Sequence, residues 1–140
     1  QLDRFLMRIS LGKPTREAEK EILKSNNIHP DELKEILSIE DIKKIQTKIA
    51  ELDVSNDIYE YILDLISESR TLKSGGLSTR AAMGIVNASK TCAFMQDSFS
   101  VLPDHVQFVF SSVAEHRLDN GNNIGESFSE KIMRNVDAIR

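Results

Sequence analysis

The sequence predicts a mainly α-helical protein, a bundle of helices preceded by one short strand. From Thr15 onward, apolar residues recur three and four positions apart, which is the spacing of one helix face. Serine or threonine precedes most of these periodic segments, as expected of residues that cap helix N-termini. Before Thr15 the period is different, because residues 7–11 alternate apolar and polar side chains and then stop at a Gly-Lys-Pro sequence.

We expect residues 7–11 to form the single strand. One strand cannot satisfy its own backbone hydrogen-bonding groups, so its partners must lie in another chain or in sequence that is not part of these 140 residues. The sequence therefore suggests a truncated chain in which residues 1–14 are the remainder of a preceding domain and residues 15–140 form the helical domain.

Three helices are expected in the first third of the helical domain. Thr15 can cap a helix from residue 16 to about residue 24, which Asn26 and Asn27 end. A short helix is expected at residues 31–37, after Pro30. Residues 38–41, Ser-Ile-Glu-Asp, resemble a capping box that opens a helix reaching about residue 52. Its inner face would consist of Ile42, Ile45 and Ile49.

Two helices are expected in the middle of the chain. One begins after Ser55, and its apolar stripe consists of Ile58, Tyr61, Ile62, Leu65 and Ile66. A loop containing Gly75 and Gly76 leads to Ser78, which we expect to cap a long helix ending near Gln96. Small residues crowd that helix, namely Ala81, Ala82, Gly84, Ala88, Ser89, Cys92 and Ala93. Because small side chains let neighbouring helices approach closely, we expect it at the centre of the bundle.

Two further helices complete the prediction. Pro103 suits the first position of a helix that ends near Arg117. The inner face of that helix would consist of Val106, Val109, Phe110 and Val113. After a polar loop at residues 119–123, a capping box at residues 127–130 opens the last helix. We expect that helix to bury Phe128, Ile132, Val136 and Ile139.

Composition excludes several classes of protein. The 15.8 kDa chain has a formal charge of -4 and a pI near 5.4, which argues against nucleic acid as a partner and against an anionic membrane surface. A lone cysteine, Cys92, rules out an intrachain disulfide and favours a reducing, cytoplasmic location. No apolar stretch is long enough for a membrane span, and no signal peptide is evident at the N-terminus.

Metal and nucleophilic chemistry are not indicated. His29, His105 and His116 are scattered and have no nearby ligand residues at metal-binding spacing, so we expect no metal site and interpret them as surface or capping residues. Cys92 lies on the small-residue face of the central helix, where a buried and inert thiol is the ordinary case.

The sequence also lacks the elements that hydrolyse ATP. Residues 12–15, Gly-Lys-Pro-Thr, superficially resemble the end of a P-loop. However, Met7 stands where that loop needs glycine, and Pro14 stands where it needs serine or threonine. Without a phosphate-binding loop and a carboxylate pair for magnesium, these residues cannot form an ATPase alone.

Three stretches resemble the C-terminal part of MoxR-type AAA+ ATPases. Residues 1–5, Gln-Leu-Asp-Arg-Phe, together with the strand and residues 12–14, look like the end of the family's ATPase core. Residues 76–81, Gly-Leu-Ser-Thr-Arg-Ala, are similar to the element that opens a lid helix. Residues 101–106, together with residues 114–118, look like the last lid segment. Leu102 departs from the pattern, because the family usually has a capping serine or threonine there, a loss of about 1 kcal/mol.

The resemblance implies roles for three residues. Arg80 would be the sensor 2 arginine, which contacts the γ-phosphate of ATP at the subunit's own core, and Ser78 would lie with it at the nucleotide. A guanidinium in the first turn of a helix is suited to an anion by its charge and by the helix dipole. Arg4 would be an arginine finger that acts in trans on the ATP of a neighbouring subunit. The alternatives are an exposed Arg80 paired with a carboxylate, and a local salt bridge between Arg4 and Asp3.

The resemblance further implies a lid domain that couples ATP binding and hydrolysis, with magnesium, to conformational change in a chaperone-like ring. That ring would be a homo-oligomer, commonly a hexamer, in the cytoplasm, and a protein with a von Willebrand factor A domain would be a typical partner. A different class of function also fits the sequence: a stand-alone helical adaptor that binds another protein and needs no nucleotide.

Overall fold

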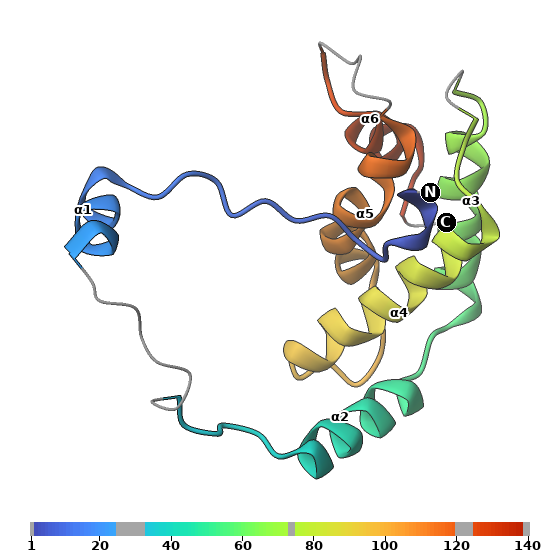
Figure 1. Ribbon diagram of the computed structural model, residues 1–140. Coiled ribbons are helices and arrows are strands. Elements are labelled where there is room, and N and C mark those ends of the chain that lie inside the picture. Colours follow the sequence, from blue (N-terminus) through green and yellow to red (C-terminus); the bar gives the residue numbers. More distant parts are fainter. Residues whose placement is uncertain (1, 25–32, 73–74, 120–124, 139–140) are drawn as a thin grey trace.

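The computed structural model describes residues 2–24, 33–72, 75–119 and 125–138. Within these ranges a 3-10 helix, Leu2–Arg4, is followed by six α-helices (Figure 1). These are α1 (Arg16–Lys24), α2 (Ile39–Glu51), α3 (Asn56–Ser69), α4 (Thr79–Met95), α5 (Pro103–Leu118) and α6 (Phe128–Asn135). The prediction of a mainly helical fold is therefore confirmed.

The core lies between α3, α4, α5 and α6. Every buried residue of the described part falls between Ile58 and Ile132. The predicted stripe of α3 and the predicted inner face of α5 are all buried. α4 packs against α2, α3 and α5, and α5 packs in turn against α6. Ala81 and Ala93 on α4 are completely buried, which confirms the central position predicted from its small residues.

Most helix starts follow from side-chain caps. Ser38 and Asp41 form the predicted capping box of α2. Ser55, Ser78 and Ser127 each accept a hydrogen bond from a backbone N–H in the first turn of the helix they precede. α5 begins at Pro103 as predicted, and Leu102 offers its N-terminus no side-chain cap.

His105 compensates in part for that missing cap. Its Nδ1 accepts a hydrogen bond from the backbone N–H of Leu102 at 3.0 Å, and its side chain is buried. This is the second half of a capping box, in which a side chain of the first turn bonds back to the residue before the helix. The interpretation of His105 as a capping residue is therefore correct, although the residue is not on the surface.

Two predicted elements are not found. Residues 7–11 form no strand, and the described part of the chain contains no sheet; the backbone N–H of Arg8 donates to the carbonyl of Ser112 at 2.8 Å. A strand requires a neighbouring strand, and none is present among the described residues. Residues 33–37 are not helical either. Leu33 and Ile36 are 72% and 93% exposed, so this short segment has no apolar contact to stabilise a helix.

Some predictions fall outside the described residues. These are the structure of residues 25–32, which include Asn26, Asn27 and His29, most of the loop at 119–123, and the burial of Ile139. On α6, Ile132 is buried as expected and Phe128 is half-buried; Val136, which follows the end of the helix, is also half-buried. On α2, Ile45 and Ile49 are half-buried, but Ile42 is 45% exposed, so the inner face of that helix is only partly covered.

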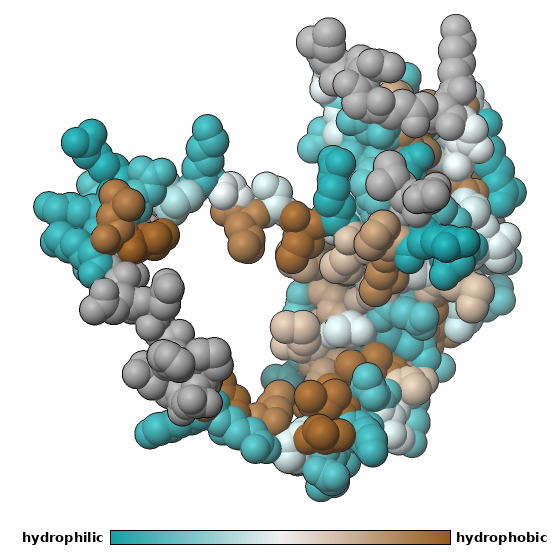
Figure 2. Space-filling model, in the orientation of Figure 1, coloured by the Kyte–Doolittle hydropathy of each residue, from teal (hydrophilic) through white to brown (hydrophobic). Residues whose placement is uncertain are grey.

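The N-terminal part of the chain forms an arm. Residues 7–15 run as an extended chain away from the helical body to α1, none of whose residues is buried (Figure 1). Apolar side chains line this arm (Figure 2), including Leu11 at 96% and Leu23 at 87% exposure. The arm therefore meets the helical body mainly through its first few residues.

Candidate functional site

The start of α4 is fixed by the loop that precedes it. The hydroxyl of Ser69, at the end of α3, donates to the carbonyl of Ile66 at 2.6 Å and accepts from the N–H of Leu77 at 2.9 Å. Gly76 has a φ of +72°, a left-handed conformation that favours glycine. A Cβ atom there would lie 2.6 Å from Cγ of Arg70. These contacts determine where Ser78 and Arg80 lie on the helical body.

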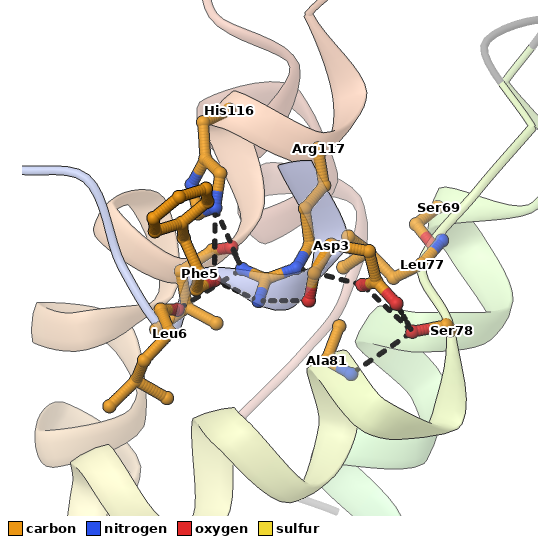
Figure 3. A network of polar contacts seen from close by, with 10 residues as sticks. Asp3, Phe5, Leu6, Ser69, Leu77, Ser78, Ala81, His116 and Arg117 are labelled. Atoms are coloured by element: carbon orange, nitrogen blue, oxygen red, sulfur yellow. Dashed lines mark hydrogen bonds and ion pairs between the residues drawn. The ribbon is translucent and has the colours of Figure 1, made fainter. Parts of the chain in front are cut away.

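Ser78 connects the start of α4 to residues 3–6, which we call the N-terminal segment, through Asp3. Its Oγ accepts from the N–H of Ala81 at 3.1 Å and donates to the carboxylate of Asp3, 3.0 and 3.1 Å from the two oxygens (Figure 3). Both hydrogen-bonding functions of the hydroxyl are therefore engaged. For Ser78 to contact a phosphate with its hydroxyl, the bond to Asp3 must open.

Arg117, near the end of α5, binds the same segment from the other side. Its Nε donates to Oδ1 of Asp3 at 3.0 Å. Its Nη1 donates to the carbonyls of Leu6, at 3.1 Å, and of Val113 in its own helix. Its Nη2 donates to the carbonyls of Asp3, at 3.3 Å, and of Phe5 (Figure 3). The side chain of Arg117 is only 6% exposed, so the guanidinium is enclosed by these acceptors.

Asp3 is ionised more readily than an ordinary aspartate. Burial disfavours its charged form, but hydrogen bonds from Ser78 and Arg117, and then the positive charges of Arg117 and Arg80, outweigh that effect. The pKa of Asp3 is therefore held below its usual value of 3.8. The same effects show that Arg80 lies close enough to Asp3 for its charge to be felt there.

This shifted pKa predicts a dependence of stability on pH. A carboxyl whose pKa is lower in the folded protein adds stability above its ordinary pKa, and that stability is lost as the pH falls through the lowered value. We therefore expect wild type to have a larger free energy of unfolding than Asp3→Asn at neutral pH. The difference should shrink below about pH 4. Urea denaturation of both proteins at a series of pH values measures it, and a difference independent of pH would contradict the assignment.

The two arginines singled out in the sequence are both exposed. Arg80 lies in the first turn of α4, and Arg4 ends the 3-10 helix Leu2–Arg4. The local salt bridge between Arg4 and Asp3 is not found, because Asp3 pairs with Arg117 instead. Across the described ranges, neither Arg4 nor Arg80 has a hydrogen bond or an ion pair with another side chain. Both guanidinium groups are thus available to a group outside this chain.

Residues 114–118 have structural roles that the sequence did not reveal. The carboxylate of Glu115 accepts from the backbone N–H groups of Phe128 and Ser129, at 3.1 and 2.8 Å, and so caps α6. His116 is buried, with Nε2 at 3.3 Å from the carbonyl of Phe5. Arg117 binds the N-terminal segment. In the sequence residues 114–118 are recognisable only as a motif; the fold shows that Glu115 and Arg117 hold two different parts of the chain.

An exposed arginine at a helix N-terminus is an arrangement that attracts anions such as phosphate. Arg80 supplies a positive charge at the N-terminus of a 17-residue helix, whose first backbone N–H groups have no acceptor within the helix. Arg4 supplies a second positive charge. In the parts of the chain that the structure describes, no group of three or more histidine, cysteine or acidic residues is placed to hold a metal ion. Nor does any described helix have the length and apolar character to cross a membrane.

Known proteins are similar to this chain in sequence and in fold. A family model for the AAA lid domain matches residues 67–137. Chaperone MoxR1 of Mycobacterium tuberculosis is 30% identical over 129 residues, and an uncharacterised Bacillus subtilis protein, YeaC, is 28% identical over 122 residues. Each alignment covers 84% of this chain. The crystal structure of a candidate ATPase from Cytophaga hutchinsonii superimposes with a TM-score of 0.80 at 28% identity, over 97% of this chain.

The chain belongs to the AAA lid domain family, and it is the lid part of a MoxR-type AAA+ ATPase. It spans 34% of the length of the Mycobacterium relative, 38% of the Bacillus relative and 47% of the solved Cytophaga chain. The alternative of a stand-alone helical adaptor is not favoured by these similarities.

Proposed function

We propose that this chain is the moving lid of an AAA+ ATPase, closing over ATP and magnesium held by a core that the rest of the polypeptide supplies. Residues 1–14 would belong to that core and residues 15–140 to the lid. The observation that carries the proposal is the position of Arg80, an exposed guanidinium in the first turn of α4 beside the segment that would lead to the core. In this role Arg80 contacts the γ-phosphate, so that lid position depends on the nucleotide.

Arg4 has the complementary role in this proposal. It is exposed and follows Asp3, whose carboxylate is already paired with Arg117. An arginine held in this way can extend into the ATP site of a neighbouring subunit, where its charge stabilises the transferring phosphoryl group. The proposal therefore requires a homo-oligomeric ring, for which a hexamer is the expected size.

The exposed apolar arm also supports a missing core. Residues 7–11 have the alternation of a strand, yet no strand lies beside them in the described part of the chain. We propose that they pair with the sheet of the core. The superposition covers 97% of this chain but only 47% of the Cytophaga chain, which supports the existence of a further domain with which residues 7–11 could pair. Ser78 would reach the nucleotide only after releasing Asp3.

The wider role is proposed from the relatives. One of them is named a chaperone, and we propose that the intact protein acts as a chaperone-like ring in the cytoplasm. A protein with a von Willebrand factor A domain is the partner we would test first. The chain itself has no surplus of positive charge that would suit nucleic acid.

Substitution of Arg80 tests the central proposal. In the intact protein we expect Arg80→Ala to lower the rate of ATP hydrolysis on the order of 10²-fold, because the positive charge that would stabilise the transferring phosphate is lost. Since Arg80 is exposed, the free energy of unfolding should change by no more than about 0.5 kcal/mol. Steady-state phosphate release measures the rate. Thr79→Ala, at the exposed neighbouring position, is the matched control, and unchanged turnover in Arg80→Ala would exclude the role.

A further inference from the structure

One network of hydrogen bonds lies between the two arginines that we assign to nucleotides. Asp3 immediately precedes Arg4, and Ser78 is two residues before Arg80. The carboxylate of Asp3 is bonded to Ser78 on one side and to Arg117 on the other (Figure 3). A finger for the neighbouring ATP and a sensor for the subunit's own ATP are thus joined by a single carboxylate.

Arg117 holds both chain neighbours of Arg4. It binds the carboxylate and the carbonyl of Asp3, and it binds the carbonyl of Phe5. The backbone of Arg4 is therefore fixed on both sides while its own side chain remains exposed. Rotation about the backbone at Arg4 would require one of these bonds to break.

The same segment is seated closely on α4. A Cβ atom on Gly84 would lie 3.1 Å from Cδ1 of Leu6 and 3.7 Å from Cγ1 of Val113. The absence of a side chain at Gly84 lets Leu6 approach the helix that carries Arg80. Although we assign residues 3–6 to the core, these contacts hold them against both α4 and α5, so their position is coupled to that of the lid.

We propose that Arg117 is a positioning residue that fixes Arg4 relative to Arg80, so that closure of the lid at one ATP site sets the reach of the finger into the next site. This inference rests on the proposed function, because it assumes that both arginines act on ATP. The inference adds two points to the proposed function. Arg117 is the residue that transmits the position of the lid, and the effect runs from a subunit's own nucleotide to that of its neighbour.

The chemistry of Arg117 explains why another cation would serve poorly. Its planar guanidinium reaches acceptors in Asp3, Phe5 and Leu6 with three different nitrogens. Lysine has one ammonium group on a flexible stem and cannot span these acceptors in a fixed geometry. Lysine at this position would keep the charge near Asp3 but leave the backbone carbonyls of the segment unbound.

A double-mutant cycle in the intact protein tests the proposal. We expect Arg117→Lys to lower ATP turnover by on the order of tenfold to a hundredfold, since small displacements of a reacting group are costly. Nucleotide affinity should be retained. In an Arg4→Ala background, Arg117→Lys should lower turnover no further, because the finger that it positions is already gone. Arg134→Lys is the matched control, since Arg134 pairs with Glu126 on the lid, outside this network, and its turnover should be unchanged.

The outcomes separate this inference from the proposed function. Additive effects of Arg117→Lys and Arg4→Ala would overturn the inference, and so would an Arg117→Lys protein with wild-type turnover. If Arg117→Lys fails to fold, the same double-mutant cycle is carried out with Asp3→Asn in place of Arg117→Lys. Asp3 belongs to the same network, and because it is half-exposed its substitution should be better tolerated by the fold. The proposed function fails on a different result, namely wild-type turnover in both Arg4→Ala and Arg80→Ala.

Discussion

Arg4→Ala in the intact protein should abolish most ATP hydrolysis while leaving nucleotide binding in place. Removal of an arginine finger lowers turnover by about 10³-fold or more, because the charge that forms on the transferring phosphoryl group loses a fixed counter-charge. Arg4 is exposed, and the segment around it is held by Arg117 through backbone carbonyls and Asp3, so we expect the substitution to leave that segment in place. Phosphate release and nucleotide titration together measure the two effects.

Action in trans gives this prediction a stricter test. Mixing Arg4→Ala subunits with subunits that are defective only in their phosphate-binding loop should restore part of the activity, because each supplies what the other lacks. No recovery would argue against a finger that reaches the neighbouring site. Arg8→Ala is the control. Arg8 is an exposed arginine on the same arm, and its hydrogen bond to Ser112 of α5 is made by the backbone N–H, which alanine retains.

Gly76→Ala should destabilise the fold by about 3 kcal/mol. Alanine in the left-handed conformation costs about 1–2 kcal/mol, and forcing a methyl group into a filled space costs about 1–3 kcal/mol. Both costs apply at Gly76, where φ is +72° and the backbone Cα of Arg70 would lie 2.7 Å from the new Cβ. Because this glycine is two residues before Ser78, we also expect the start of α4 to shift.

The adjacent glycine separates the two costs. Gly75 has a φ of +98°, but nothing lies within 4 Å of the position of its Cβ. Gly75→Ala should therefore cost only the conformational part, about 1–2 kcal/mol. Urea denaturation of both variants measures the difference, and equal losses would show that the contact with Arg70 is relieved by a small movement.

The helices were predictable because their signals are local. Each signal acts within a few residues of the structure that it determines. These signals are the apolar stripe on α3, the capping serines at residues 38, 55, 78 and 127, and Pro103 at the start of α5. The strand expected at residues 7–11 is not confirmed, for the opposite reason. Alternation fixes which side chains share a face, but a strand exists only where another strand pairs with it.

The sequence predicts which exposed arginines belong to the candidate site. It does not predict the hydrogen bonds that hold the surrounding segments together. Arg4, Ser78 and Arg80 stand in recognisable motifs, and whether they act on nucleotide remains a prediction. Arg117 is 114 residues from Asp3 in sequence, and no local pattern pairs them. Residues 114–118 match a motif that does not indicate what they contact. Only the packing of α5 against the N-terminal segment shows that Glu115 and Arg117 have separate structural tasks.

The way in which Arg117 holds the N-terminal segment has an evolutionary consequence. Its bonds to Phe5 and Leu6 are made to carbonyl oxygens, which every amino acid possesses, whereas its bonds to Asp3 include a carboxylate that few residues could replace. Among relatives, positions 3 and 117 should therefore change together or not at all. The side chain at position 5 is 66% exposed, and the bond from Arg117 to the carbonyl of that residue does not restrict which amino acid stands there.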